Sequence, residues 1–272
     1  MICYQGLIES FFEKKLINNK LTFVNYFRSI LGILLFTALF SLLIPIVSII
    51  VVISFGKLTD WVLEKIAPPL ARFILWILGI NYRIKYHQTK LEDGTILMGN
   101  VHTPAIYIVN HASTLDILTI LALAIQRVRF VAKWEMQYFP FFFLLGRLTG
   151  QIFIKRRDRE KAIQTLQKNY GKVQQHHRSI LIAPEGTRKH EMPIGPFKKG
   201  AFRMALDLSY PIVPIYFKGT TELNEGGSLF TKAGSITAHV FSPISTDRWK
   251  EATLEKNIED IRNKYLQWSQ DL

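Results

Sequence analysis

The stretch that decides the fold is AIYIVNHASTLD, residues 105–116. Its first five residues are apolar and rich in β-branched and aromatic side chains, which is typical of a buried strand. Polar residues end that strand, and the apolar pair after Asp116 begins a helical pattern. Ser113 or Thr114 would suit the N-cap of that helix. The stretch therefore predicts a junction of strand, loop and helix.

Two residues of this junction, His111 and Asp116, are of the types that general acid–base chemistry uses. On one regular helix, which advances about 100° per residue, their side chains would point about 140° apart. They can meet only if His111 lies on the loop and Asp116 in the first turns of the helix. The carboxylate could then fix the imidazole tautomer while a substrate hydroxyl attacks directly. A histidine and an aspartate that merely cap a helix would show the same spacing, so the pair alone is a weak signal.

Short β-rich runs alternate with helical patterns from about residue 82 onward. The predicted strands are residues 82–86, 105–109, 129–132, 151–155, 180–183, 212–217 and 236–241, and the predicted helices are residues 114–126, 159–176, 200–208 and 248–268. Residues 223–234, with their glycines, predict a loop. This alternation predicts the α/β class, with a mixed, largely parallel sheet flanked by helices. In such sheets, binding sites gather where strands end.

The N-terminal third differs from the rest, because residues 29–56 contain no charged residue. About 20 apolar residues suffice for a helix that crosses a bilayer. A second apolar stretch, residues 66–80, contains Arg72 and is flanked by aromatic residues, which is typical of an interfacial helix. We therefore expect a helical membrane anchor in residues 1–81 and an α/β domain in residues 82–272.

Two arrangements of this anchor stay open at the level of sequence. In one, a single helix spans the bilayer and the second stretch lies at the interface. In the other, a helical hairpin bent at Pro45 or near Gly56 dips into one leaflet, so that all soluble parts stay on one side. We favour the hairpin, while two buried core helices of a soluble protein are the third interpretation. Basic residues on both sides of the apolar run give no clear orientation.

The composition narrows the function classes. The net charge of +13 fits nucleic acid, an anionic membrane surface, or a phosphorylated or acidic substrate. The basic residues are scattered among apolar strands, and no helix-turn-helix or zinc module is recognisable, which argues against nucleic acid. The one cysteine, Cys3, excludes an intrachain disulfide and a zinc site built on thiolates.

The second candidate block is PEGTR, residues 184–188, which follows an apolar run. Gly186 permits a positive φ angle or a close backbone approach. Arg188 offers a planar fork that suits a phosphate, and Glu185 could orient that fork or bind a hydroxyl. A surface turn with an ordinary ion pair is the alternative interpretation.

Three further blocks place unusual residues at the ends or in the middle of predicted elements. IKRR, residues 154–157, delivers basic residues at the end of a strand, and FKKG, residues 197–200, opens a helix. Lysine at a helix N-terminus is more readily explained by an anionic ligand than by stability. Pro214, inside a β-rich run, lacks a ladder donor and predicts a bulge or an edge strand.

Taken together and in this order, the blocks resemble those of the glycerolipid acyltransferase superfamily, in particular the bacterial 1-acylglycerol-3-phosphate acyltransferases (lysophosphatidate acyltransferases). The resemblance covers residues 82–243. The HxxxxD pattern is weak alone, but it is highly specific when PEGTR follows at this distance. The resemblance implies an α/β acyltransferase fold, a two-helix membrane anchor, an acyl-CoA or acyl-carrier-protein donor, and no metal or other cofactor.

The resemblance also implies a role for each matching residue. His111 would be the general base and Asp116 its partner. The residues that would bind the substrates are Arg156, Glu185, Gly186, Thr187, Arg188, Lys198 and Pro214. Within that set, Arg156 and Lys198 would help to hold a phosphate, and Pro214 would line the acyl pocket. Many members of the family have Asp at the position of Lys155, so we assign that residue no role.

The expected reaction moves a fatty acyl chain to the sn-2 hydroxyl of a lysophosphatidate and gives phosphatidate for phospholipid biosynthesis. The expected partners are the bilayer, the lysophosphatidate and the acyl donor, without nucleic acid. The expected location is a bacterial inner membrane, with the α/β domain on the cytoplasmic side. The same transfer to glycerol 3-phosphate, another lysophospholipid or an ornithine-type lipid stays open. A non-catalytic lipid-binding protein is a further alternative, against which the intact His111 and Asp116 argue.

Overall fold

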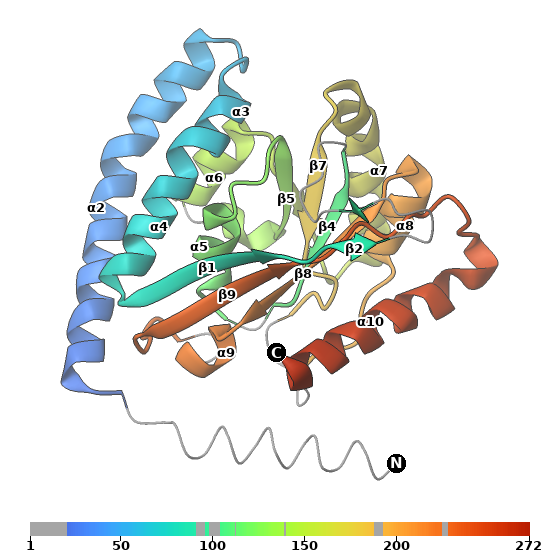
Figure 1. Cartoon of the computed structure of the whole chain (residues 1–272). Coiled ribbons are helices and arrows are strands. Elements are labelled where there is room, and N and C mark those ends of the chain that lie inside the picture. The colour runs from blue at the N-terminus through green and yellow to red at the C-terminus, as the bar shows by residue number, and fades with distance from the viewer. Residues whose placement is uncertain are drawn as a thin grey trace.

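A computed structural model describes residues 21–90, 96–97, 104–111, 113–138, 140–187, 193–224 and 228–272. It shows a twisted sheet with helices on both faces and a long N-terminal helix along one side (Figure 1). The strands are β1 (Ile80–Tyr86), β2 (Thr89–Lys90), β3 (Ile96–Leu97), β4 (Ile106–Val109), β5 (Val128–Lys133), β6 (Ile152–Ile154), β7 (Ser179–Ile182), β8 (Ile212–Lys218) and β9 (Gly234–Val240). The helices are α2 (Phe23–Ile53), α3 (Thr59–Trp61), the π-helix η1 (Val62–Ile66), α4 (Ala67–Ile77), α5 (Asp116–Ala122), the 3-10 helix η2 (Trp134–Tyr138), α6 (Pro140–Leu148), α7 (Arg159–Gln175), α8 (Gly200–Leu208), α9 (Thr220–Leu223), the 3-10 helix η3 (Glu251–Thr253) and α10 (Leu254–Asp271).

The main sheet has the strand order β1-β9-β8-β4-β7-β5-β6. Its neighbouring strands are parallel except for the antiparallel pair β8 and β9. All seven predicted strands form this sheet, so the predicted α/β class with a mixed, largely parallel sheet is confirmed. Helix α6 was not predicted, and the predicted helix 114–126 ends early, at Ala122.

Strand β4 lies in the middle of the molecule and is buried on both faces. Ile106 and Ile108 pack in the cluster that includes residues of α8 and α10, whereas Tyr107 and Val109 pack with Leu123 just beyond α5. A strand covered on both faces carries apolar residues at every position, which explains the unbroken apolar run before the candidate site. The parallel strands β4 and β7 end at the same edge of the sheet, where the polar residues that follow them meet.

The expectation of a bulge or an edge strand at Pro214 is wrong. Strand β8 lies inside the sheet, between β9 and β4, and Pro214 pairs with Ile108 in the parallel ladder. The Pro214 carbonyl accepts a hydrogen bond from Phe241, one residue beyond the last residue of β9. The nitrogen of the same residue faces the same side as its carbonyl, so the missing N–H falls where the β9 ladder has ended. The proline is tolerated because it stands at the end of one ladder, although its strand is central.

The N-terminal segment forms a helical hairpin. Helix α2 runs through Pro45 without a break, and the chain reverses where Phe55 and Gly56 have positive φ angles of 51° and 78°. It then returns through α3, η1 and α4. Of the two bends considered from the sequence, the reversal near Gly56 is the one that forms. Among the described residues, α2 is the one helix long and apolar enough to cross a membrane.

Candidate active site

His111 and Asp116 meet as their spacing predicts. His111 lies on the loop after β4, Asp116 is the first residue of α5, and His111 Nδ1 lies 2.7 Å from Asp116 Oδ2. The predicted cap is wrong in one detail, because the N-cap of α5 is Leu115, whose side chain makes no capping bond. Instead of a side chain of the loop that accepts from the helix backbone, the Asp116 side chain accepts from the loop: the Ser113 N–H donates to Asp116 Oδ2 at 3.0 Å. The carboxylate therefore organises the loop and the imidazole with the same oxygen.

The two members of the pair differ in their access to solvent. Asp116 is 1% exposed, whereas the His111 side chain is 19% exposed. A carboxylate at Nδ1 favours the tautomer that carries its proton there, which leaves the lone pair on Nε2. Asn110 fixes the start of the loop, because its side-chain amide donates to the Phe217 carbonyl and accepts from the Phe217 N–H. The arrangement can take a proton from a hydroxyl that approaches the exposed side of the ring.

Glu185 lies beside the pair and is buried, with 3% of its surface exposed. Its Oε1 accepts the His111 N–H at 2.8 Å, and its Oε2 accepts the Gly195 N–H at 2.7 Å. Burial raises the pKa of Glu185 to about 7, although the two N–H donors act to lower it. The residue thus ties the turn after β7 to the His111 loop through backbone contacts.

The turn after β7 also brings Arg156 and Lys198 to Gly186. Gly186 has a φ angle of 71°, and a Cβ atom there would lie 2.9 Å from the Lys198 Nζ. The absence of a side chain lets Lys198 run across the turn, while the Arg156 guanidinium donates to the Gly186 carbonyl at 2.7 Å. Two cations therefore gather at the turn that joins Glu185. Thr187 is exposed beside them, and Arg188 lies outside the described residues.

The remaining predicted substrate residue, Pro214, lies deeper in the molecule. It is buried next to Ile108, three positions before His111 along the β4 segment. Lys155, to which we assigned no role, places its Nζ 5.1 Å from the centre of the Trp134 ring. Trp134, Lys155 and Arg156 line a cavity of about 210 Å³.

Comparison with known proteins identifies the family of this chain. The family model described as Acyltransferase matches residues 83–218, which is half of the chain. The chain belongs to the Acyltransferase family. Its fold is also that of a solved relative, the 1-acyl-sn-glycerophosphate (LPA) acyltransferase PlsC from Thermotoga maritima, with a TM-score of 0.69, 18% identity, and coverage of 95% of this chain and 99% of the other.

Two curated relatives of this chain carry the same name. The 1-acyl-sn-glycerol-3-phosphate acyltransferase of Cocos nucifera is 34% identical over 195 residues, which cover 72% of this chain and 60% of the relative. The protein of the same name in Haemophilus influenzae is 37% identical over 160 residues, which cover 58% of this chain and 63% of the relative. The chain thus spans less than two thirds of the length of these relatives.

The sequence did not reveal two residues of α10 that support the candidate site from the interior of the molecule. The Tyr265 hydroxyl, fully buried, donates to the Ile108 carbonyl at 2.8 Å and accepts the Ile215 N–H at 3.0 Å. Arg262 donates to the carbonyls of Ile194 and Gly195, the residue whose N–H holds Glu185. Both lie about 150 residues from β4 in a helix with no motif, so no local signal marks them.

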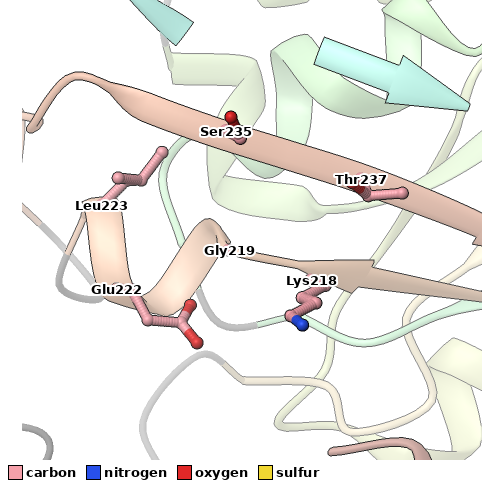
Figure 2. A pocket seen from close by; sticks show the side chains of 6 residues that line it. All are labelled: Lys218, Gly219, Glu222, Leu223, Ser235 and Thr237. Carbon is pink, nitrogen blue, oxygen red and sulfur yellow. The ribbon is translucent and has the colours of Figure 1, made fainter. Parts of the chain in front are cut away.

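A pocket of about 400 Å³ is lined by residues of β8, α9 and β9, and His111 is not among them (Figure 2). Figure 2 labels the lining residues Glu222 and Leu223 on α9 and Ser235 and Thr237 on β9. Gly219 between them has a φ angle of 95°, and a Cβ atom there would lie 2.3 Å from a carbonyl oxygen of β9. Leu223, which lines this pocket, directly precedes Asn224.

Proposed function

We propose that this acyltransferase moves a fatty acyl chain from a thioester donor to the sn-2 hydroxyl of 1-acyl-glycerol 3-phosphate. The observation that carries the proposal is the contact between His111 Nδ1 and Asp116 Oδ2 at the carboxyl end of β4. Relatives named for this reaction support the choice of acceptor. The donor is acyl-CoA or acyl-carrier protein, and both carry the same thioester.

The reaction needs one proton transfer in each direction. His111 Nε2 takes the proton of the sn-2 hydroxyl as its oxygen attacks the thioester carbonyl carbon, and general-base assistance of this kind typically contributes about 10²–10⁴-fold. The C–S bond of the tetrahedral intermediate then breaks, and the imidazolium returns the proton to the leaving thiolate. Asp116 stabilises the imidazolium between the two transfers.

The acceptor phosphate is held, in this proposal, by the cations at the Gly186 turn. Arg156 and Lys198 converge there, and Glu185 joins the same turn to His111. A phosphate on the sn-3 carbon lies only a few bonds from the sn-2 hydroxyl, so its site must be close to the base. Arg188 of the same motif adds a third cation, and Pro214 lines the path of the acyl chain.

The hairpin of α2 and α4 is, we propose, an anchor that lies in one leaflet. A 31-residue helix is about 46 Å long, more than the roughly 30 Å of the hydrocarbon core. Ser29 near one end bonds to Thr231, and Val47 and Val51 near the other end pack against Leu145 and Leu148 of the α/β domain. A transverse orientation would carry those domain residues into the bilayer, whereas a flat one exposes Phe27, Leu34, Ile49 and Trp76 to lipid.

An acceptor panel tests the reaction. Purified protein in detergent is mixed with oleoyl-CoA or oleoyl-carrier protein and with lysophosphatidate, glycerol 3-phosphate, lysophosphatidylcholine or an ornithine lysolipid, and the His111→Ala variant serves as control. We expect transfer to lysophosphatidate, and its loss in the variant. Absence of transfer to any glycerophosphate acceptor would refute the proposal, and preferred transfer to another acceptor would replace the substrate but keep the chemistry.

Membrane washing tests the anchor. Membranes from expressing cells are treated with high salt and then with alkaline carbonate. We expect the protein to stay in the membrane fraction after both. Release by salt alone would show that electrostatic attraction holds the protein and that the apolar hairpin is not inserted.

A further inference from the structure

Asn224, the residue just after α9, connects the catalytic loop to a distant segment of the chain. Its side chain is 3% exposed. The Oδ1 atom accepts the Ser113 hydroxyl at 2.8 Å and the Thr114 N–H at 3.0 Å. The Nδ2 atom donates to the carbonyls of Ser228 at 3.1 Å and Phe230 at 2.9 Å. All the hydrogen-bonding capacity of the amide is therefore used, half of it on each loop.

These bonds lead directly to the His111–Asp116 pair. Asn224 holds Ser113 and Thr114, and the Ser113 N–H donates to Asp116 Oδ2, the oxygen that holds the imidazole. The Ser113 hydroxyl also accepts the Leu115 N–H at the start of α5, and the Thr114 hydroxyl donates to the Ser228 carbonyl at 2.7 Å. The loop between His111 and α5 is therefore fixed both by its own local bonds and from outside, through Asn224 and Ser228.

The loop on the other side of Asn224 is held by the N-terminal helix. The Thr231 N–H donates to the hydroxyl of Ser29, which is fully buried on α2, at 3.0 Å. The rings of Tyr26 and Phe230 meet edge to face with their centres 5.1 Å apart. The loop Ser228–Thr231 thus lies between the anchor helix and the catalytic loop, and it contacts both.

We propose that Asn224 is a positioning residue for the His111–Asp116 pair, and that α2 supports it through Ser29 and Thr231. This inference rests on the acyl transfer proposed above and adds to it a structural role for the anchor helix. Asn224 touches neither reacting atom, so its removal should lower kcat and leave the affinity for both substrates unchanged. A displacement of about 1 Å in a catalytic group can cost up to about 10²-fold in rate.

The first test is a kinetic comparison of Asn224→Ala with Asn169→Ala, which removes an amide on α7 bonded only within that helix. We expect Asn224→Ala to lower kcat about 30-fold, with KM values for lysophosphatidate and oleoyl-CoA within about two-fold of the parent. The control should match the parent. An unchanged kcat in Asn224→Ala, or a loss confined to KM, would overturn the assignment.

A double-mutant cycle separates positioning from general damage. If Asn224 acts through Asp116, its replacement should cost less than about two-fold in an Asp116→Ala background, where the residual rate no longer depends on that carboxylate. Equal losses in both backgrounds would overturn the proposal. Where Asp116→Ala is too slow to measure, Ser113→Ala takes its place, and purely additive losses would count against the bond between Ser113 and Asn224.

One further measurement keeps this inference distinct from the proposed reaction. Hydrogen exchange of the peptide covering residues 110–118 should be faster in Asn224→Ala, whatever the substrate is, and unchanged exchange would contradict the positioning role. A parent protein that transfers no acyl chain would refute the reaction alone.

The role of α2 is tested with two serine variants. Ser29→Ala should lower kcat a few-fold, whereas Ser48→Ala, whose hydroxyl bonds within α2, should not. Equal rates for the two serine variants would remove α2 from the proposal.

Discussion

Two partly buried polar clusters lie at opposite ends of the parallel strands of the sheet, and they are built differently. The carboxyl-end cluster consists of His111, Asp116 and Glu185. The amino-end cluster consists of Arg129 near the start of β5, Arg178 before β7, and Asp60 on α3. Asp60 Oδ1 lies 2.5 Å from the Arg129 guanidinium, which is 2% exposed.

The charges and contacts of the two clusters indicate which of them serves stability. In the amino-end cluster, the carboxylate of Asp60 pairs with two guanidinium groups, and these ion pairs attach the N-terminal hairpin to the sheet. In the carboxyl-end cluster, two buried carboxyl groups lie beside a partly exposed imidazole. The hydrogen bonds of this cluster hold loops rather than whole helices or strands. In parallel α/β sheets, the carboxyl ends of the strands carry the chemistry. Mutations in the two clusters should therefore separate activity from stability.

The largest expected effect is on activity at the carboxyl end. The His111→Ala variant should lose about 10³-fold in kcat/KM, because it removes the base. Its free energy of unfolding should change by about 1 kcal/mol at most, since Asp116 Oδ2 keeps the Ser113 N–H as a donor. Acyl-transfer assays and urea unfolding on the same preparation measure both quantities. Near-normal activity would refute the assignment of the base.

The opposite pattern is expected at the amino end. The Asp60→Ala variant leaves the Arg129 charge buried without this partner, and breaking a buried ion pair from one side typically costs about 3–5 kcal/mol. The free energy of unfolding should fall by about 3 kcal/mol, while kcat per folded molecule stays at the parent value. Asp271→Ala, an exposed aspartate at the end of α10, is the matched control. A loss of kcat without a loss of stability in Asp60→Ala would reverse the roles of the two clusters.

The clusters also differ in how far the sequence could predict them. His111 and Glu185 each follow an apolar strand that is buried on both faces, so sequence patterns place both at one edge of the sheet. The role of Asn224 depends on contacts with residues 110 positions away, and a loop with a nearby Gly-Gly pair gives no sign of them. The same limit holds for the pairing of Arg129 with Asp60, which joins two segments that show no common pattern.

Strands and helices with a clear apolar periodicity form as the sequence predicts. The prediction fails where backbone angles end a helix or where a helix has no polar face. The pattern predicts that helix α5 reaches residue 126, but Ala124, which has a positive φ angle of 56°, follows its C-cap and ends it early. The run PFFFLLGRL does not predict helix α6, because it starts at a proline and lacks the polar face of a typical surface helix. Neither feature alters the order of the strands.

Glu185 offers a pH-dependent test of the carboxyl-end cluster. Its pKa of about 7 exceeds the ordinary 4.5, so the folded state holds its proton more tightly than the unfolded state. Both states are protonated below pH 4.5. Between pH 4.5 and 7 the unfolded state ionises first, so stability is lost as the pH rises, by a total on the order of 3 kcal/mol.

The variant Glu185→Gln should therefore remove that slope. Urea unfolding at several pH values from 4.5 to 8 gives the difference in unfolding free energy between parent and variant. The difference should shift in favour of the variant as the pH rises to 7 and then stay constant. Glu160→Gln, an exposed residue of α7, should give a difference that does not vary over this range. A constant difference for Glu185→Gln as well would show that its carboxyl group ionises normally.

The smallest effect is expected at two adjacent lysines at the edge of the site, Lys198 and Lys199. Lys198 lies across Gly186, next to the turn that Glu185 holds, whereas Lys199 is ion-paired with Glu255 on the surface. Lys198→Ala should raise the KM for lysophosphatidate about five-fold at constant kcat, because an exposed charge pair is worth about 1 kcal/mol. Lys199→Ala removes the same charge one residue further on and should change neither constant. The rise in KM should shrink at high salt, where the attraction to a phosphate is screened. If both variants raise KM equally, net charge at the surface rather than a defined phosphate site attracts the acceptor.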